Sequence, residues 1–400
     1  MENSAFNKWS IIFFYISMSI YPLSMVMATA LQRIGYINLA GKSIFFFYAL
    51  VYVLALVIIL RFPLSLKRLT SLYFIYILYI ILFLTSNKFV RNAFTNVGMV
   101  MIYTYYLPYA VLILSRITDF SYLLKSKFIE YTNYFIIISA FIVKYVFHNE
   151  TNYMPYSYNL LPIWLLFIFN FIYRPNLLKV IVALIMLLEG VIYGARGPLI
   201  WLATGGVLYL SLDMVEKKVL SNFNLRTVLQ IILSVALFSG VFLFLRRILG
   251  SLQTESSYIL NRINQGIIGE SSGRNFLIEA AVAHLKIMGG EINGIFFDRT
   301  LMPDGIYVHN FILETYLSFG WVLGTIILLS LIYFIGTTFF VSSQTNKKII
   351  IFVVSAFFLK YFVTGTMYGD YGVIIMLSIV YAVNEQEKRK TSDELEMPYV

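Results

Sequence analysis

Cysteine is absent from this chain of 400 residues, and charged residues make up only 12% of it. Without cysteine there is no disulfide, no thiolate nucleophile and no cysteine-based zinc site. Histidine is scarce as well: His148, His284 and His309 are far apart in sequence, and no His-Glu-x-x-His pattern occurs. We therefore expect no metal site built from protein ligands and no cofactor.

Apolar residues take the place of the missing charges. They make up 60% of the chain, and the mean hydropathy is +0.79. Soluble domains are nearer half apolar and about a quarter charged, and a single soluble core does not bury so much apolar surface. A helix needs about 20 apolar residues to cross a bilayer, so the chain has room for about a dozen spans. We expect an all-α integral membrane protein that contacts the lipid bilayer along most of its length.

The apolar runs predict twelve transmembrane helices with no internal repeat. The first run is long enough to span, so we expect it to stay as a helix and not to be a cleaved signal. The tenth run is long and several others are short, which allows for one or two broken or re-entrant spans. We place the spans near residues 11–31, 43–60, 69–84, 97–115, 129–147, 158–173, 177–193, 196–212, 227–249, 310–340, 349–364 and 368–383.

Four segments follow from this assignment. Residues 1–249 carry the first nine spans, residues 250–308 form one large extracytoplasmic loop before the tenth span, and residues 309–383 carry the last three spans. The charged cytoplasmic tail, residues 384–400, is expected to be disordered.

The distribution of lysine and arginine predicts the orientation. Basic residues favour the cytoplasmic side of a membrane, so the net charge of +10 indicates membrane topology and anionic lipid, with no nucleic-acid partner. With both termini in the cytoplasm, the short outer loops hold only Arg33, Lys42, Lys88 and Arg91 besides Arg196. The inner segments then collect Lys8, Arg61, Lys67, Arg68, Arg116, Lys125, Lys127, Arg174, Lys217, Lys218, Arg226, Lys347, Lys348, Lys388, Arg389 and Lys390.

The large loop contains a helical pattern. A segment from Asn275 to Lys286 places five apolar residues on one helical face, and Gly289-Gly290 would end that helix. We expect an amphipathic helix lying at the membrane surface. The apolar residues are Leu277, Ile278, Ala281, Val282 and Leu285.

Charged side chains within spans are costly and therefore point to function. Seven of them lie towards the outer ends of the predicted spans, and the basic ones would suit an anionic ligand held by guanidinium groups. The alternative for Lys144 and Lys360 is that they reach out to the lipid headgroups. The seven residues are Lys144, Glu189, Arg196, Arg246, Arg247, Lys360 and Asp370.

Two short motifs carry most of the functional signal. Arg196 lies between glycines and before Pro198, so it would open a helix whose free amides favour anions, although Gly190 and Gly194 are also typical of close helix packing. His309 ends the large loop and opens the next span, where its imidazole would suit proton transfer. An interfacial histidine bonded to a backbone carbonyl remains the other interpretation.

These motifs together resemble the O-antigen polymerase and ligase superfamily. The resemblance lies in the order Gly194-Ala195-Arg196-Gly197, Gly273-Arg274-Asn275 and His309-Asn310, with Gly320 and Gly324 following. The spacing of Gly320 and Gly324 also predicts close packing of that span against another helix. The layout, with a large outer loop before a span that begins with histidine, is similar too. The specific motifs cover only about fifteen residues, and the remainder of the resemblance is in the layout.

The resemblance implies a metal-independent membrane glycosyltransferase in the bacterial cytoplasmic membrane. Within the superfamily we expect a polymerase that builds O-antigen or capsular polysaccharide at the outer face of that membrane. Its substrates would be oligosaccharide repeats on undecaprenyl pyrophosphate, with a chain-length regulator as a further partner. Carried over by position, Arg196 and Arg274 would bind the pyrophosphate, and His309 would orient or deprotonate the attacking hydroxyl or contact the phosphate. The expected substrate-binding residues are Asn310, Arg246, Arg247, Arg299, Asp304 and Glu279.

Several other functions compete with this interpretation. An O-antigen ligase shares the same pattern, and a lipid-linked oligosaccharide flippase or transporter has a similar number of spans. A transporter is expected to carry internal repeats and a site at the midplane. A transferase that uses nucleotide sugars is disfavoured because no Asp-x-Asp pair occurs, and the glycines near Lys42 miss the spacing of a phosphate-binding loop.

Overall fold

A computed structural model of the protein describes residues 2–84, 102–145, 153–193, 196–216, 274–301, 307–366, 368 and 370–396. Every regular element within these ranges is helical, and they contain no β-strand. The expectation of an all-α chain is confirmed for this part of the sequence. Four of its helices are long and apolar enough to cross a membrane, or five if the broken pair α1 and α2 forms one span.

The chain divides into two compact units. Unit 1 comprises Met1–Ile20, Ile44–Ser126 and Ser271–Val400, and unit 2 comprises Tyr21–Ser43 and Lys127–Glu270. The second part of the predicted large loop, from Ser271 onward, belongs to unit 1 together with the last helices.

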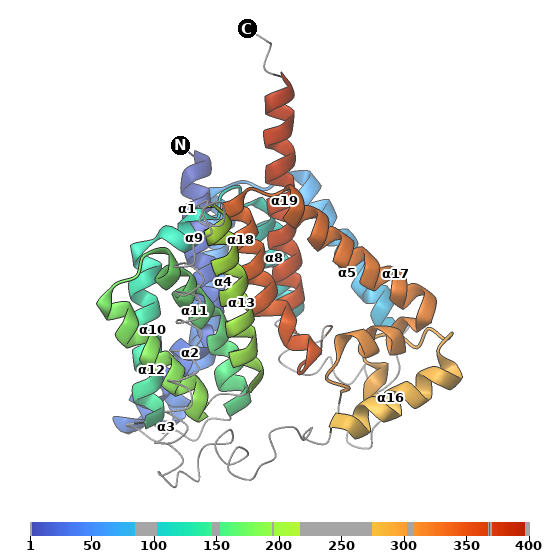
Figure 1. The fold of residues 1–400 in the computed structure, drawn as a ribbon, viewed down its shortest axis with the longest axis horizontal. Coiled ribbons are helices and arrows are strands. Elements are labelled where there is room, and N and C mark those ends of the chain that lie inside the picture. The colour runs from blue at the N-terminus through green and yellow to red at the C-terminus, as the bar shows by residue number, and fades with distance from the viewer. Residues whose placement is uncertain are drawn as a thin grey trace, which may run out of the picture. The chain divides into compact units, whose positions relative to one another are not determined.

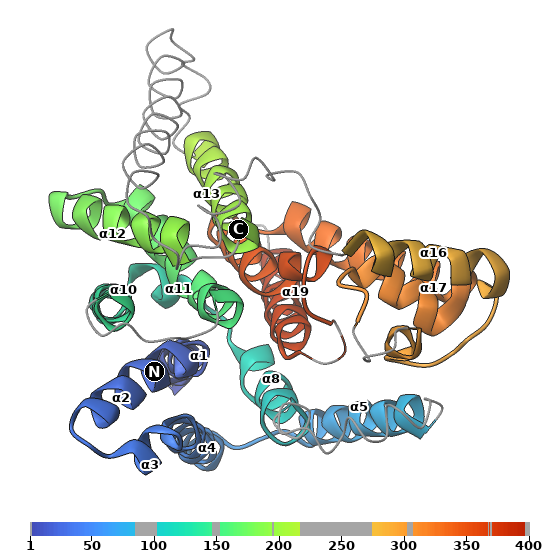
Figure 2. The same ribbon diagram turned by 90° about the horizontal axis from the view of Figure 1, so that it is seen from below.

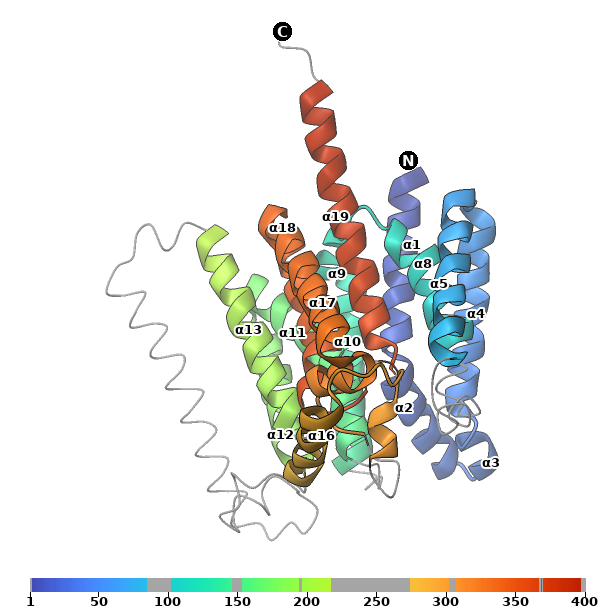
Figure 3. The same ribbon diagram turned by 90° about the vertical axis from the view of Figure 1, so that its right-hand side faces the viewer.

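Unit 1 contains the first helix and all of the C-terminal helices. Figures 1 and 3 show the start of α1 and the C-terminal half of α19 at one end of this unit and α16 at the other end. Its elements are α1 (Glu2–Met18), α4 (Ser43–Arg61), α5 (Leu66–Leu84), η1 (Ile102–Tyr106), α8 (Leu107–Leu112), η2 (Leu114–Arg116), α9 (Ser121–Lys125), α16 (Arg274–Met288), η4 (Phe297–Thr300), α17 (Phe311–Val341), α18 (Gln344–Val353), η5 (Val354–Phe358), η6 (Leu359–Phe362) and α19 (Gly372–Glu396).

Unit 2 is built around four long helices. Helix α11 packs against α10, α12 and α13, and Figure 2 shows these helices beside one another. Apolar side chains at the centre of this group, such as Trp164 and Phe169 of α11, are fully buried. The elements of unit 2 are α2 (Ile20–Arg33), α3 (Ile37–Ala40), α10 (Lys127–Tyr145), α11 (Tyr153–Tyr173), α12 (Leu177–Tyr193) and α13 (Arg196–Glu216).

Several predicted spans differ from the helices that the structure contains. The run at 11–31 is not one helix, because it breaks at Ser19 between α1 and α2. The run at 349–364 passes from α18 through a π-helical turn, η5, into a 3₁₀ turn, η6, and the described part of the run at 97–115 is similarly mixed. The ninth predicted span, 227–249, lies outside the described residues.

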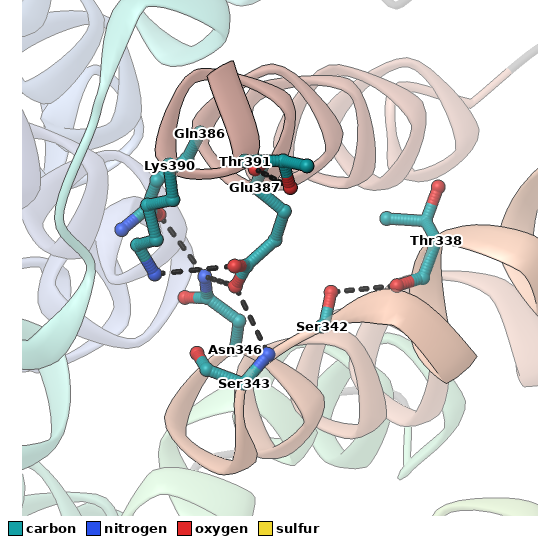
Figure 4. A network of polar contacts seen from close by, with 8 residues as sticks. All are labelled: Thr338, Ser342, Ser343, Asn346, Gln386, Glu387, Lys390 and Thr391. Atoms are coloured by element: carbon teal, nitrogen blue, oxygen red, sulfur yellow. Dashed lines mark hydrogen bonds and ion pairs between the residues drawn. The ribbon is translucent and has the colours of Figure 1, made fainter. Parts of the chain in front are cut away.

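The charged tail is helical as far as Glu396, so the expectation of disorder is wrong for residues 384–396. Helix α19 continues because Glu387 is anchored: its carboxylate accepts hydrogen bonds from the Ser343 N–H at 3.0 Å and from Asn346 Nδ2 at 2.6 Å (Figure 4). Lys390 adds an ion pair at 3.2 Å. The tail thus holds the turn between α17 and α18. The charge composition of the tail alone does not indicate this contact.

The contacts of Glu387 predict that its contribution to the stability of the protein depends on pH. Burial on its own raises the pKa of Glu387, but the hydrogen bonds from Ser343, Asn346 and Lys390 outweigh it and hold that pKa below its usual value. A carboxylate with a lowered pKa adds stability above its unfolded pKa, near 4.3, and loses it as the pH falls through the folded value. We expect Glu387→Gln to remove about 1 kcal/mol at pH 7, since solvent screens the group, and less than that at pH 3, below the unfolded pKa.

Thermal denaturation in detergent at both pH values measures this difference. Glu385→Gln is the matched control, because Glu385 only pairs with the exposed Lys388, at 3.6 Å. Equal losses for Glu387→Gln at pH 7 and pH 3 would contradict the anchoring role.

A buried lysine, Lys179, links three helices of unit 2 through an ion pair and hydrogen bonds. Lys179 of α12 is 1% exposed and lies 3.1 Å from the Glu130 carboxylate of α10. Its ammonium also donates to the Asn170 amide oxygen, to the Asn170 carbonyl at 3.2 Å and to the Arg174 carbonyl at 2.8 Å. A cation there is favoured by the carbonyl groups at the C-terminal end of α11, where the helix dipole is negative.

We expect Lys179→Met to destabilise unit 2 by about 3 kcal/mol, because it leaves the Glu130 carboxylate and the helix carbonyls without their cation. The loss should appear as a lower melting temperature in detergent. Lys127→Met, at the exposed first residue of α10, is the control. A melting temperature that moves equally little for both variants would show that the lysine does not hold the bundle.

Candidate functional site

The candidate site lies at the end of unit 1 that carries α16, where α17 is broken at Gly320. That residue has φ 69° and ψ 176°, outside the helical region. The stretch from Trp321 to Val341 is about 20 residues, or roughly 30 Å long, and by itself matches the hydrocarbon thickness of a bilayer. The first turns, Phe311–Phe319, therefore form a separate short arm.

The loop after α16 binds the broken helix through its backbone. The Ser318 carbonyl, freed by the break, accepts the N–H groups of Asn293 at 3.1 Å and Gly294 at 2.9 Å. In return the Trp321 N–H donates to the Gly289 carbonyl at 2.7 Å. A helix break of this kind needs outside partners for its orphaned polar groups, and the loop supplies them.

Glycine is required where the loop and the helix meet. A Cβ on Gly320 would lie 2.9 Å from the Glu291 carbonyl oxygen, and the positive φ already disfavours any other residue. A Cβ on Gly289 would collide with the indole of Trp321. The sequence interpretation of Gly320 and Gly324 as a helix-packing pair was wrong: Gly320 breaks the helix, and Gly324 faces Tyr316 of the same helix.

The predicted amphipathic helix exists as α16 and ends before Gly289-Gly290, as expected. Three of its five predicted apolar residues, Leu277, Ala281 and Leu285, are buried and face α17, whereas Ile278 and Val282 are 38% and 36% exposed. Figure 1 shows α16 beside α17. The helix therefore packs on protein along one stripe, and its position at a membrane surface stays a prediction.

His309 occupies a strained position between two fixed residues. Its φ is 57°, and among the described non-glycine residues only His309 and Phe296 have a positive φ. Val308 before it is 1% exposed and packs in a core with Ala281 and Leu285 of α16. Backbone strain of this kind costs on the order of 1–3 kcal/mol and persists where the surroundings enforce it.

Asn310 is the N-cap residue of α17. Its side-chain oxygen accepts the N–H groups of Ile312 at 3.0 Å and Leu313 at 3.2 Å, so it begins α17 as a typical N-cap residue. A role in binding substrate stays a prediction.

The Tyr307 ring contacts both His309 and Arg299. The Tyr307 and His309 ring centroids are 4.1 Å apart, and the Arg299 guanidinium carbon lies 5.8 Å from the Tyr307 centroid and 4.9 Å from that of Phe296. His309 and Arg299, two of the predicted site residues, are thus linked through one shared ring. Stacked arginine remains able to hold an anion with its outer nitrogens.

A buried carboxyl group, Asp298, underlies this segment. It is 1% exposed, and its Oδ2 atom accepts the Val308 N–H at 3.0 Å. Burial raises the pKa of Asp298 above its usual value, against the opposing effects of that N–H and of the neighbouring Arg299.

The segment between η6 and α19 contacts the first turns of α17. Thr366 donates a hydrogen bond to the buried Glu314 carboxylate of α17, and the Thr315 and Tyr368 hydroxyls lie 3.4 Å apart. The Tyr368 ring in turn contacts Phe296, at 6.4 Å between centroids. The first turns of α17 are therefore held by this segment and by the loop together.

Lys360 and Asp370 form an ion pair within unit 1. The ammonium lies 2.5 Å from the carboxylate, and the side chains are 13% and 25% exposed. The same ammonium is 5.5 Å from the Tyr371 ring, which stacks on Tyr106 at 4.1 Å. The alternative that Lys360 reaches the headgroups is therefore wrong: the lysine is paired inside the protein.

Unit 2 holds a second buried polar group of its own. Tyr156 of α11 donates a hydrogen bond to the Glu189 carboxylate of α12, and Lys144 of α10 lies 5.7 Å from the Tyr156 ring. Glu189 is fully buried and Lys144 is 6% exposed. The alternative that Lys144 reaches outward is wrong, because its side chain is buried and its ammonium lies over the Tyr156 ring.

The other predicted site residues are only partly visible. Arg196 begins α13 in unit 2 and Arg274 begins α16 in unit 1, as a helix-terminus role requires, but their side chains lie outside the description. Glu279 is exposed on α16. Arg246, Arg247 and Asp304 lie outside the described residues. Within the described part of the chain, no group of three or more His, Cys, Asp and Glu side chains is placed to hold a metal ion.

Sequence reasoning missed Asp298, Tyr307, Glu314 and Thr366. A signal existed for Glu314, because a carboxylate inside the predicted span 310–340 is costly and by default functional. The pairing of Glu314 with Thr366, 52 residues later, has no local signal.

No protein-family model, no curated protein and no solved structure matches this chain.

Proposed function

We propose that the protein is a membrane glycosyltransferase that joins oligosaccharide repeats carried on undecaprenyl pyrophosphate at the outer face of the bacterial cytoplasmic membrane. The observation that carries this proposal is the His309 segment. A strained imidazole precedes a broken helix, and its Tyr307 neighbour also contacts the guanidinium of Arg299, which lies on a loop bonded to that helix. This arrangement offers a proton acceptor and a cation, and the transfer of a sugar from a pyrophosphate needs both.

The reaction forms one bond and breaks one bond. A hydroxyl oxygen of the acceptor repeat attacks the anomeric carbon of the donor chain, and the bond from that carbon to the pyrophosphate oxygen breaks. The leaving undecaprenyl pyrophosphate takes the electron pair, and cations of unit 1 such as Arg299 and Arg274 stabilise its growing charge. The acceptor proton passes to the His309 imidazole or to the departing phosphate.

The contacts of the basic residues support the orientation that this proposal needs. Towards the end of unit 1 with the α1 start and the α19 C-terminal half, the Arg116 guanidinium lies 4.4 Å from the Phe6 ring of α1, and the Arg68 guanidinium lies 5.6 Å from the Tyr381 ring of α19. Lys8 lies over the Tyr122 ring there as well. Since basic residues favour the cytoplasm, we place that end inside and the His309 segment outside.

Deletion of the gene in its host tests the function. We expect surface glycan to shrink to a single repeat, with the ladder of longer chains lost on a gel, and the wild-type gene to restore it. Loss of all surface repeats while long polymer stays on its lipid carrier would mean a ligase. Accumulation of single lipid-linked repeats on the cytoplasmic face would mean a flippase, and an unchanged ladder would exclude all three.

A further inference from the structure

Asp298 is joined to the residue before His309 by a hydrogen bond that crosses the loop. Its Oδ2 atom accepts the Val308 N–H at 3.0 Å, ten residues further along the chain. Both partners are 1% exposed, so water does not compete for this bond. The turn η4, which presents Asp298, also presents Arg299 to the Tyr307 ring.

Attachment of the loop does not depend on this bond. Asn293 and Gly294 are bonded to the Ser318 carbonyl, and Gly289 accepts the Trp321 N–H. Val308 also packs with Leu317 in an apolar core. The particular effect of Asp298 is therefore local, because it fixes the orientation of the Val308 peptide group.

The direction of the imidazole follows from its two neighbours. Asp298 holds Val308 on one side, and Asn310 on the other side is held as the cap of α17. With both flanking residues fixed, the backbone of His309 keeps its positive φ of 57°, and its ring stays 4.1 Å from that of Tyr307. Loss of either support would let the strained residue relax to a more common conformation.

We propose that Asp298 is a positioning residue: its carboxylate, by holding the Val308 N–H, keeps the His309 imidazole in the orientation that the transfer step uses. This inference rests on the proposed function and adds to it a residue that does not itself touch the substrate. Catalysis tolerates only small errors in the placement of such a group.

The test uses the full-length protein in membrane vesicles. The probe is the lipid-linked single repeat extracted from the host strain that lacks the gene. Initial rates of oligomer formation give kcat and KM for wild type, Asp298→Ala, Asp298→Leu and Asp298→Asn. Asp119→Ala is the control, because the Asp119 carboxylate likewise accepts a backbone N–H, from Ser121 at 2.8 Å, but on an exposed turn before α9.

We expect Asp298→Ala and Asp298→Leu to lower kcat at least tenfold, with KM within twofold of wild type. Leucine, unlike alanine, fills the space of the lost carboxylate, so this variant keeps the test valid if the alanine variant fails to reach the membrane. Asp298→Asn should recover kcat to within about threefold, because its amide oxygen accepts the same N–H. An unchanged kcat in the leucine variant, a change confined to KM, or an asparagine variant as weak as the leucine variant would each overturn the inference.

A second pair of variants separates this inference from the proposed function. If Asp298 acts through His309, then Asp298→Leu has no further effect on the residual rate of His309→Gln. A tenfold effect in both backgrounds would overturn the positioning role while leaving the function standing. Full activity of His309→Gln would instead refute the proposed site itself.

Discussion

A His309→Ala variant should lose at least about 100-fold in the rate of polymerisation while the protein still reaches the membrane. If the imidazole takes the proton of the attacking hydroxyl, its loss removes general base catalysis, which contributes roughly 10²–10⁴-fold. The ring lies beside Tyr307 and is not part of the apolar core formed by Val308 and Leu317, so its removal should cost little stability. Quantified surface glycan ladders in the deletion host, normalised to the amount of protein in the membrane, measure the effect.

His284→Ala is the matched control for this variant. That histidine, in α16, packs against the Phe297 ring with centroids 5.0 Å apart and has no part in the proposed reaction. Its removal should leave the ladder intact. A complete ladder from His309→Ala would mean that the imidazole does not take part in the reaction.

Gly320→Ala is expected to abolish the ladder and to lower the melting temperature of the protein. A residue with a Cβ costs about 1–2 kcal/mol in the left-handed region, and here the Cβ would also lie 2.9 Å from the Glu291 carbonyl oxygen. Because Asn293 and Gly294 bond to the Ser318 carbonyl at the same break, the loop must move to admit the methyl group. That movement would carry the His309 segment away from the first turns of α17.

Gly336→Ala provides the comparison within the same helix. No atom lies within 4 Å of a Cβ built on Gly336, and alanine is the better helix former by up to about 1 kcal/mol. This variant should be as active as wild type and equally or more stable. Equal melting temperatures for the two glycine variants would contradict the account of the break.

Local patterns in the sequence predicted the elements that depend on local physics. The apolar periodicity and Gly289-Gly290 gave the helix α16 and its end, because burial on one face and helix breaking are properties of neighbouring residues. The run at 43–60 likewise became α4, with Arg61 as its last residue. His309 at the opening of a long helix was also predicted correctly.

Features that depend on distant partners were not predictable. A glycine that breaks a helix and a glycine that packs within one look alike in sequence, and at Gly320 the difference is made by the carbonyl of Glu291. The tail after residue 383 is helical because Glu387 meets Ser343 and Asn346, about forty residues earlier. Charge composition alone predicted disorder there.

The same limit applied to the candidate site. Arg299 was predicted as a substrate contact from its place in the loop, and the structure adds its stacking between Phe296 and Tyr307. Asp298 was overlooked because a lone aspartate beside an arginine carries no signal until the chain folds back to Val308.

The most direct test of the central claim is a reconstituted reaction. Purified protein in liposomes receives undecaprenyl-pyrophosphate-linked single repeats, and both the oligosaccharides and the free undecaprenyl pyrophosphate are measured. We expect oligosaccharides of two or more repeats, with one undecaprenyl pyrophosphate released for each new linkage. Repeats that stay single, with no carrier released by folded wild-type protein, would contradict the claim that this protein is a polymerase.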